Sequence, residues 1–148
     1  HRRVPEAMRA IRLGRTKVIV GGRAEGEALV SSQPITFFGG VDPKTGEVIE
    51  GGHEIGGQRL AGRVLVFPHG QGSTVGSYVL YSLARRRIAP AAIINSQFDA
   101  IVASGCVMGG IPLLLMPQEA RLRIREGDVL RIGRSGRLEA LRRGPRGP

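Results

Sequence analysis

The sequence predicts an α/β domain with a mixed sheet, organised around a strand–glycine loop–helix unit at residues 63–87. Residues 64–67 (VLVF) are a short apolar run rich in β-branched and aromatic side chains, typical of a buried strand. Pro68 ends that strand, and the glycines that follow it permit a tight turn. Apolar residues then recur at helical spacing up to the arginines at 85–87, which the negative end of a helix favours.

Upstream of this unit, glycine- and proline-containing turns separate short β-branched runs. We expect a short helix within residues 1–13, a strand over 16–20 and a strand over 27–31, the two strands being able to pair. Residues 33–45 contain two prolines and a double glycine and predict a loop. A short strand over 47–49 follows it.

Downstream, apolar runs alternate with one helical segment, which places a parallel crossover at residues 63–95. The expected elements are strands over 91–95, 111–116, 121–125 and 129–132, and a helix over 100–106 capped by Asp99.

The charge is concentrated at the two ends of the 148-residue chain. Residues 1–15 and 133–148 each hold five Arg and one Glu, so little of the net charge of +10 belongs to the rest. We therefore expect a basic extension over 1–14, one domain over 15–132 and a disordered Arg-rich tail over 133–148. Aromatic residues make up only 4% of the chain, which disfavours nucleic acid as the main partner because stacking platforms are missing.

Cofactor chemistry is limited by the single cysteine. Cys106 cannot form an internal disulfide or supply the several thiolates of a zinc or iron–sulfur site, and the three histidines lack metal-ligand spacing. No apolar run approaches the length of a membrane span. We expect a cytoplasmic protein that binds no metal of its own.

The hydroxyls at the start of the central helix are the first candidate site. Ser73 and Thr74 stand where helix N–H groups are free and the dipole is positive, a place that caps a helix, binds an anion or stabilises an alkoxide. The segment is neither a Walker A loop nor a nucleophile elbow, because the lysine and the glycine spacing of those motifs are missing.

Two further segments contain polar residues with two interpretations. Gly39, Gly40 and Asp42 belong either to a turn or to a loop that brings backbone N–H groups to a ligand. His53 and Glu54 lie in a glycine-rich loop as acid–base candidates, but a surface loop is the favoured interpretation because nothing nearby in the sequence holds their geometry.

Three segments carry a resemblance to a known family. Residues 26–53 (GEALVSSQPITFFGGVDPKTGEVIEGGH), 64–86 (VLVFPHGQGSTVGSYVLYSLARR) and 89–114 (APAAIINSQFDAIVASGCVMGGIPLL) resemble the small subunits of the aconitase X family. The likeness covers roughly residues 15–132. It implies the swivelling β/β/α domain of aconitases and a separate large subunit that holds a [4Fe-4S] cluster, in a heterodimer or larger complex.

The resemblance is greatest to members that act in the archaeal mevalonate pathway. It implies the dehydration of (R)-5-phosphomevalonate to trans-anhydromevalonate 5-phosphate, with Ser73 as the base. The family's two glycine loops would contact the substrate, and their residues in this chain are Gly39, Gly40, Asp42, Gly72, Thr74 and Ser77. Gln71 stands where many relatives have Lys or Arg, which leaves Arg15, Arg23 or the large subunit to bind the phosphate.

Three alternatives remain at this point. Other aconitase X members dehydrate hydroxyproline-type substrates, so another hydroxy acid is one of them. A second is a non-catalytic module that shapes the specificity of a partner. A third is an RNA-binding domain that uses the basic ends of the chain.

Overall fold

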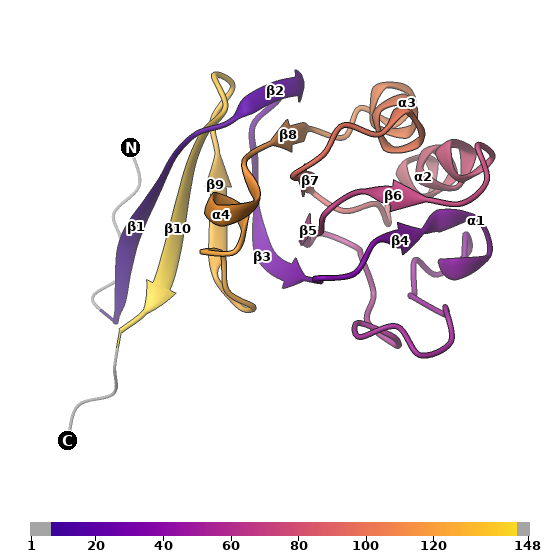
Figure 1. Ribbon diagram of the computed structural model, residues 1–148, viewed down its shortest axis with the longest axis horizontal. Coiled ribbons are helices and arrows are strands. Elements are labelled where there is room, and N and C mark those ends of the chain that lie inside the picture. Colours follow the sequence, from indigo (N-terminus) through magenta and orange to yellow (C-terminus); the bar gives the residue numbers. More distant parts are fainter. Residues whose placement is uncertain (1–6, 145–148) are drawn as a thin grey trace.

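The computed structural model describes residues 7–144, and within them the chain forms ten strands and four helices (Figure 1). The strands are β1 (Met8–Arg15), β2 (Lys17–Val20), β3 (Ala24–Val30), β4 (Ile35–Thr36), β5 (Val64–Val66), β6 (Gly70–Gln71), β7 (Ala92–Asn95), β8 (Leu113–Leu115), β9 (Val129–Ile132) and β10 (Arg137–Arg143). The helices are α1 (Phe37–Gly40), α2 (Gly76–Arg85), α3 (Ala100–Gly109) and α4 (Gln118–Arg121).

Eight strands form one mixed sheet in the order β1-β10-β9-β3-β5-β7-β8-β2, and β4 pairs with β6 in a separate two-stranded sheet. The run from β3 to β8 is parallel, and the other pairings of the large sheet are antiparallel. β1 and β2 are the two edge strands, although Thr16 alone separates them in sequence, so the sheet must curl. The hydroxyl of Thr16 donates to the carbonyl of Gly136 at 2.8 Å, which ties the junction to the β9–β10 turn.

Alternate residues of the parallel strands feed two apolar cores, as a sheet buried on both faces requires. Leu29, Leu65, Ile93 and Leu113 point to the side covered by α2 and α3. Their neighbours Ala28, Val64, Ala92 and Leu114 point to the opposite side, where they pack against β9, β10 and residues near α4.

The central unit is confirmed. β5 leads through Pro68 to the short β6, then to a turn and α2, and β5 and β7 pair in parallel as the crossover predicts. The cap of α3 is also confirmed, because the Asp99 carboxylate accepts N–H groups of Ile101 at 2.8 Å and Val102 at 3.4 Å.

Both ends of the described chain differ from the predictions. The helix expected within residues 1–13 is wrong where the structure describes it, since β1 pairs with β10 in register from Met8↔Arg143 to Arg15↔Arg137. The disorder expected from residue 133 is wrong for 133–144 for the same reason, and residues 1–6 and 145–148 lie outside the described part. The expected boundaries at 15 and 132 therefore fall inside one continuous sheet.

The Asp128 carboxylate shows how the last strand is held. It is 2% exposed and accepts from the Arg142 guanidinium, with 2.9 Å to Nε and 2.8 Å to Nη2. Burial would raise the pKa of Asp128, but the hydrogen bonds from Arg142 and the Arg125 amide outweigh it and lower that pKa. A residue of the expected tail thus completes a buried ion pair.

Three smaller predictions are also wrong. The strands over 16–20 and 27–31 do not pair with one another, because β2 pairs with β8. Residues 121–125 end α4 and form turns, which place Ile124 in the core. Residues 47–49 contribute only isolated bridges to Val41 and Arg59.

Candidate functional site

The two glycine loops meet because β4 and β6 pair in parallel, Ile35 with Gly70 and Thr36 with Gln71. β4 leads directly into α1, and β6 leads into the turn before α2 (Figure 1). Residues 37–40 and 72–75 are therefore neighbours, although more than thirty residues of chain separate them.

Close packing fixes the second loop in place. Gly72 has φ +89°, and a Cβ there would lie 2.8 Å from Cγ2 of Thr36, so glycine is required for both backbone and space. A Cβ at Gly70 would overlap the Asp99 carboxylate and approach Cγ2 of Val102 to 2.7 Å. The start of α3 and the end of β4 thus clamp the loop from two sides.

Ser73 lies exposed in the turn that opens α2. Its Oγ accepts the N–H of Val75 at 3.2 Å, and its carbonyl accepts the N–H of Gly76 at 2.9 Å. The prediction that Ser73 or Thr74 caps the helix is wrong, because Val75 occupies the N-cap position and no side chain caps α2. The hydroxyl of Ser73 is thus exposed at the positive end of a ten-residue helix with one amide directed at it.

Thr74 and Ser77 have different environments. Ser77 is 7% exposed, and its hydroxyl donates to the Thr74 carbonyl at 3.0 Å, so it holds the turn. The Thr74 side chain is exposed. Both line a pocket of about 280 Å³, whose other lining residues are Val75, Tyr78, Ala100, Ile101 and Ser104.

The Gly39–Asp42 segment lies beside this turn. A Cβ at Gly76 would lie 3.4 Å from the Cβ of Phe37 and 3.5 Å from the backbone nitrogen of Phe38, which measures how closely α1 approaches α2. Gly39 is exposed with φ +90°, and the carbonyl of Gly40 accepts two backbone N–H groups. The Asp42 carboxylate accepts the N–H of Lys44 at 2.8 Å and so stabilises the turn that follows.

Sequence reasoning missed Glu50. Its Oε1 atom is buried and has no hydrogen-bond partner among the described residues, and a Cβ at Gly40 would lie 3.0 Å from it. Glu50 is held there by the bond from its backbone N–H to the Gly40 carbonyl. Nothing in its sequence context, VIEGG, indicates that burial.

His53 and Glu54 serve the loop around them. Nε2 of His53 donates to the Pro34 carbonyl at 3.0 Å and Nδ1 accepts from Ile55 at 3.3 Å, in a side chain that is 9% exposed. Burial would raise the pKa of Glu54, but hydrogen bonds from Ser31 and its two following residues outweigh it and lower that pKa. These contacts connect residues 53–55 to the segment that follows β3.

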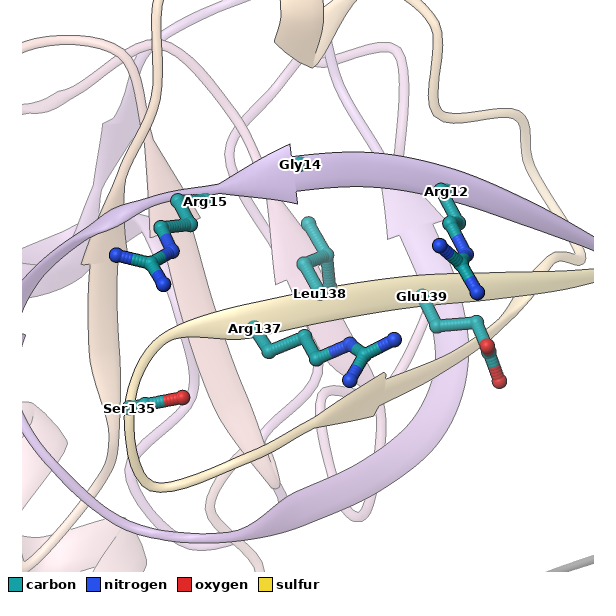
Figure 2. A pocket seen from close by; sticks show the side chains of 7 residues that line it. All are labelled: Arg12, Gly14, Arg15, Ser135, Arg137, Leu138 and Glu139. Atoms are coloured by element: carbon teal, nitrogen blue, oxygen red, sulfur yellow. The ribbon is translucent and has the colours of Figure 1, made fainter.

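The arginines considered for phosphate binding lie elsewhere. Arg15 lines a pocket of about 360 Å³ on the β1–β10 pair, and Figure 2 shows it beside Arg137 and Ser135, with Arg12 and Glu139 farther along the strands. β1 and β10 lie at the opposite end of the molecule from α1 and α2 (Figure 1). Arg15 is therefore not brought together with Ser73, and Arg23 precedes β3 at the end of that strand away from β4.

The described residues do not fit an iron–sulfur cluster. Cys106 is fully buried in α3, and burial raises the pKa of its thiol to about 12. Within residues 7–144 no group of three or more His, Cys, Asp or Glu side chains is placed to hold a metal ion. No helix in that range is long and apolar enough to cross a membrane.

Comparison with known proteins identifies the family. The model of the aconitase X swivel domain matches residues 14–140. The phosphomevalonate dehydratase small subunit of Methanosarcina mazei is 47% identical over 133 residues, which are 88% of this chain and 91% of that protein. That of Thermococcus onnurineus is 54% identical over 119 residues, 75% of this chain and 92% of that protein.

A solved structure agrees with these relatives. The crystal structure of Thermococcus kodakaraensis aconitase X in its holo form superposes with a TM-score of 0.80 at 44% identity, over 85% of this chain and 95% of that chain. The swivel fold that the sequence predicts is thereby confirmed. The chain belongs to the aconitase X swivel-domain family.

Proposed function

We propose that this chain is the small subunit of a hydro-lyase that dehydrates (R)-5-phosphomevalonate to trans-anhydromevalonate 5-phosphate. Relatives that are 44–54% identical to this chain and cover most of it are named phosphomevalonate dehydratase small subunit, which supports the proposal. The single observation that carries it in the structure is the exposed hydroxyl of Ser73, held at the start of α2 beside a second glycine loop.

The reaction needs a base on the carbon next to the substrate carboxylate. In the proposed step the Ser73 alkoxide takes that proton, the electron pair of the C–H bond becomes the new C=C bond, and hydroxide leaves from the adjacent carbon. A serine hydroxyl is a weak acid, so its alkoxide needs stabilisation. The N–H of Val75, 3.2 Å from Oγ, and the positive end of the α2 dipole supply it.

The other predicted site residues have supporting roles. Thr74 is exposed next to the base and is available to donate to the substrate, while Ser77 and Gly72 fix the turn. Gly39 and Gly40 place backbone groups beside the Ser73 turn. The Asp42 carboxylate stabilises their loop by accepting the N–H of Lys44. The phosphate is assigned to the large subunit, because Arg15 lines a pocket on the β1–β10 pair that includes none of the candidate site residues.

The proposal includes a partner and a compartment. The [4Fe-4S] cluster that the family resemblance implies would be held by the large subunit, since the buried thiol of Cys106 does not fit it. The substrate is a small charged metabolite, so we place the enzyme in the cytoplasm.

Reconstitution tests the proposal. The chain and a cluster-loaded large subunit from the same organism are assayed separately and together on 5-phosphomevalonate and on a hydroxyproline. Turnover of phosphomevalonate by the complex alone is the expected result. Turnover of hydroxyproline instead would assign the chain to another aconitase X reaction, and a large subunit that is fully active without this chain would refute a catalytic role.

A further inference from the structure

Helix α3 has an unusual composition for a helix at a protein surface. Its ten residues, AIVASGCVMG, include no charged side chain. Val102 and Cys106 pack into the core, yet on the outer side Val107 is 66% exposed and Met108 41%. A helix that is apolar all round is normally covered on every side.

Helix α2 presents a second apolar stripe. Val75, Tyr78 and Tyr81 are three residues apart, so they share one side of the helix, and they are 44%, 62% and 38% exposed. Arg85 is the one charged residue of α2. The two helices together thus hold one charge in twenty residues, whereas 23% of the chain is charged.

The two stripes form one surface. α2 and α3 cross closely at Gly105, where a Cβ would lie 2.7 Å from Cδ1 of Leu80. The 280 Å³ pocket lies between them, with Tyr78 on one wall and Ser104 on the other. We call this surface the α2–α3 face; its residues are Val75, Tyr78, Tyr81, Ser104, Val107 and Met108.

The α2–α3 face continues into the proposed site. Thr74 lines the same pocket, and Ser73 is the next residue along the chain. Phe38, 54% exposed, lies on the other side of the turn, because its backbone nitrogen approaches Gly76. A base at this position reaches a substrate held by another chain only if that chain closes over these residues.

The chemistry of the face selects its occupant. Tyr and Met on a surface that lacks charged residues are characteristic of the central part of a protein–protein interface. A polyanion would instead require basic residues on the face, and the exposed arginines nearest to it, residues 85–87, lie at the opposite end of α2 from the turn at Ser73. We propose that the α2–α3 face is the surface on which the large subunit docks, an inference that rests on the proposed function.

Binding and activity are measured separately to test it. Val107→Glu and Tyr81→Glu each put a charge on the face without touching the turn at Ser73. Leu122→Glu is the matched control, because Leu122 is 59% exposed next to α4 on the other side of the sheet. Dissociation constants for the cluster-loaded large subunit come from titration calorimetry, and circular dichroism verifies folding.

The two face variants are expected to weaken binding by about 30-fold or more, and Leu122→Glu by less than about threefold. At saturating large subunit, Val107→Glu should recover wild-type kcat. The inference is overturned if both face variants bind the large subunit as tightly as the wild type does. It is also overturned if the two variants disrupt only the self-association of this chain. A wild-type complex that forms without dehydrating phosphomevalonate overturns the proposed function alone, because the dissociation constants do not depend on turnover.

Discussion

Gly70→Ala is the substitution whose effect the structure defines most sharply. The φ of Gly70 lies outside the left-handed region, so alanine meets no backbone penalty and the whole effect is steric. The new methyl group overlaps the Asp99 carboxylate and stands 2.7 Å from Cγ2 of Val102, which is fully buried. Either the loop before Ser73 or the start of α3 must move.

Two costs add up at this position. Forcing a methyl group into a packed core costs about 1–3 kcal/mol. Displacing the Asp99 side chain weakens the cap of α3, which is worth about 1 kcal/mol. Together they predict a loss of about 2–4 kcal/mol in the free energy of unfolding, or roughly 6–12 °C in Tm for a chain of this size.

Gly51→Ala is the matched control for this experiment. A Cβ at Gly51 meets nothing within 4 Å, and its φ is also outside the left-handed region. Thermal and urea unfolding, followed by circular dichroism, should show Gly70→Ala destabilised and Gly51→Ala unchanged or slightly stabilised. A Tm for Gly70→Ala within 2 °C of the wild type would refute the argument that α3 clamps the loop.

Three further predictions follow from the buried and hydrogen-bonded groups. Asp128 has a pKa below its unfolded value, so its contribution to stability is complete above about pH 4 and is lost as the pH falls further. Asp128→Asn should therefore lower the free energy of unfolding by about 2–3 kcal/mol at pH 7. Urea titrations at several pH values should also show that this free energy falls less steeply below about pH 4 in Asp128→Asn, but not in Glu119→Gln, a control at an exposed position. Cys106, buried and with a pKa raised to about 12, should resist iodoacetamide in the native chain at pH 8 and react in urea, and rapid native labelling would contradict its burial. Glu54→Ala should accelerate amide hydrogen exchange at Ser32 and Gln33, whose N–H groups its carboxylate accepts, and unchanged exchange there would show that the loop is held by other contacts.

Local patterns in the sequence predict the central part of the fold well. Pro68 after an apolar run, the glycines of the loop and the Asp99 cap each act through the residues next to them. The parallel crossover follows from the same alternation of strand and helix. The family resemblance supplies the swivel fold, and the roles of Ser73 and its neighbours in substrate binding and catalysis stay predictions.

The ends of the sheet depend on contacts that no local pattern shows. β1 pairs with β10 across more than 120 residues, and its apolar positions at 8 and 11 fit a helix as well as a strand. From the sequence alone, Arg142 belongs to a solvated basic tail. Its role depends on Asp128, which the fold buries opposite it. Pairing and burial over such distances are decided by the tertiary fold.

The candidate site shows the same division. The strands that unite its two loops are two residues long each, too short to leave a period in the sequence. The buried oxygen of Glu50 becomes visible only once Gly40 is packed beside it. The position of the turn at the start of α2 depends on both the pairing of β4 with β6 and the clamp from α3.

The most direct measurement of the central claim is exchange of the substrate's carbon-bound proton. The complex with saturating large subunit is incubated with 5-phosphomevalonate in D₂O, and both deuterium incorporation next to the carboxylate and formation of product are followed by NMR. If Ser73 is the base, Ser73→Ala should slow both by about a thousandfold or more while binding the large subunit as tightly as the wild type. Exchange and dehydration within tenfold of the wild-type rates would contradict the account.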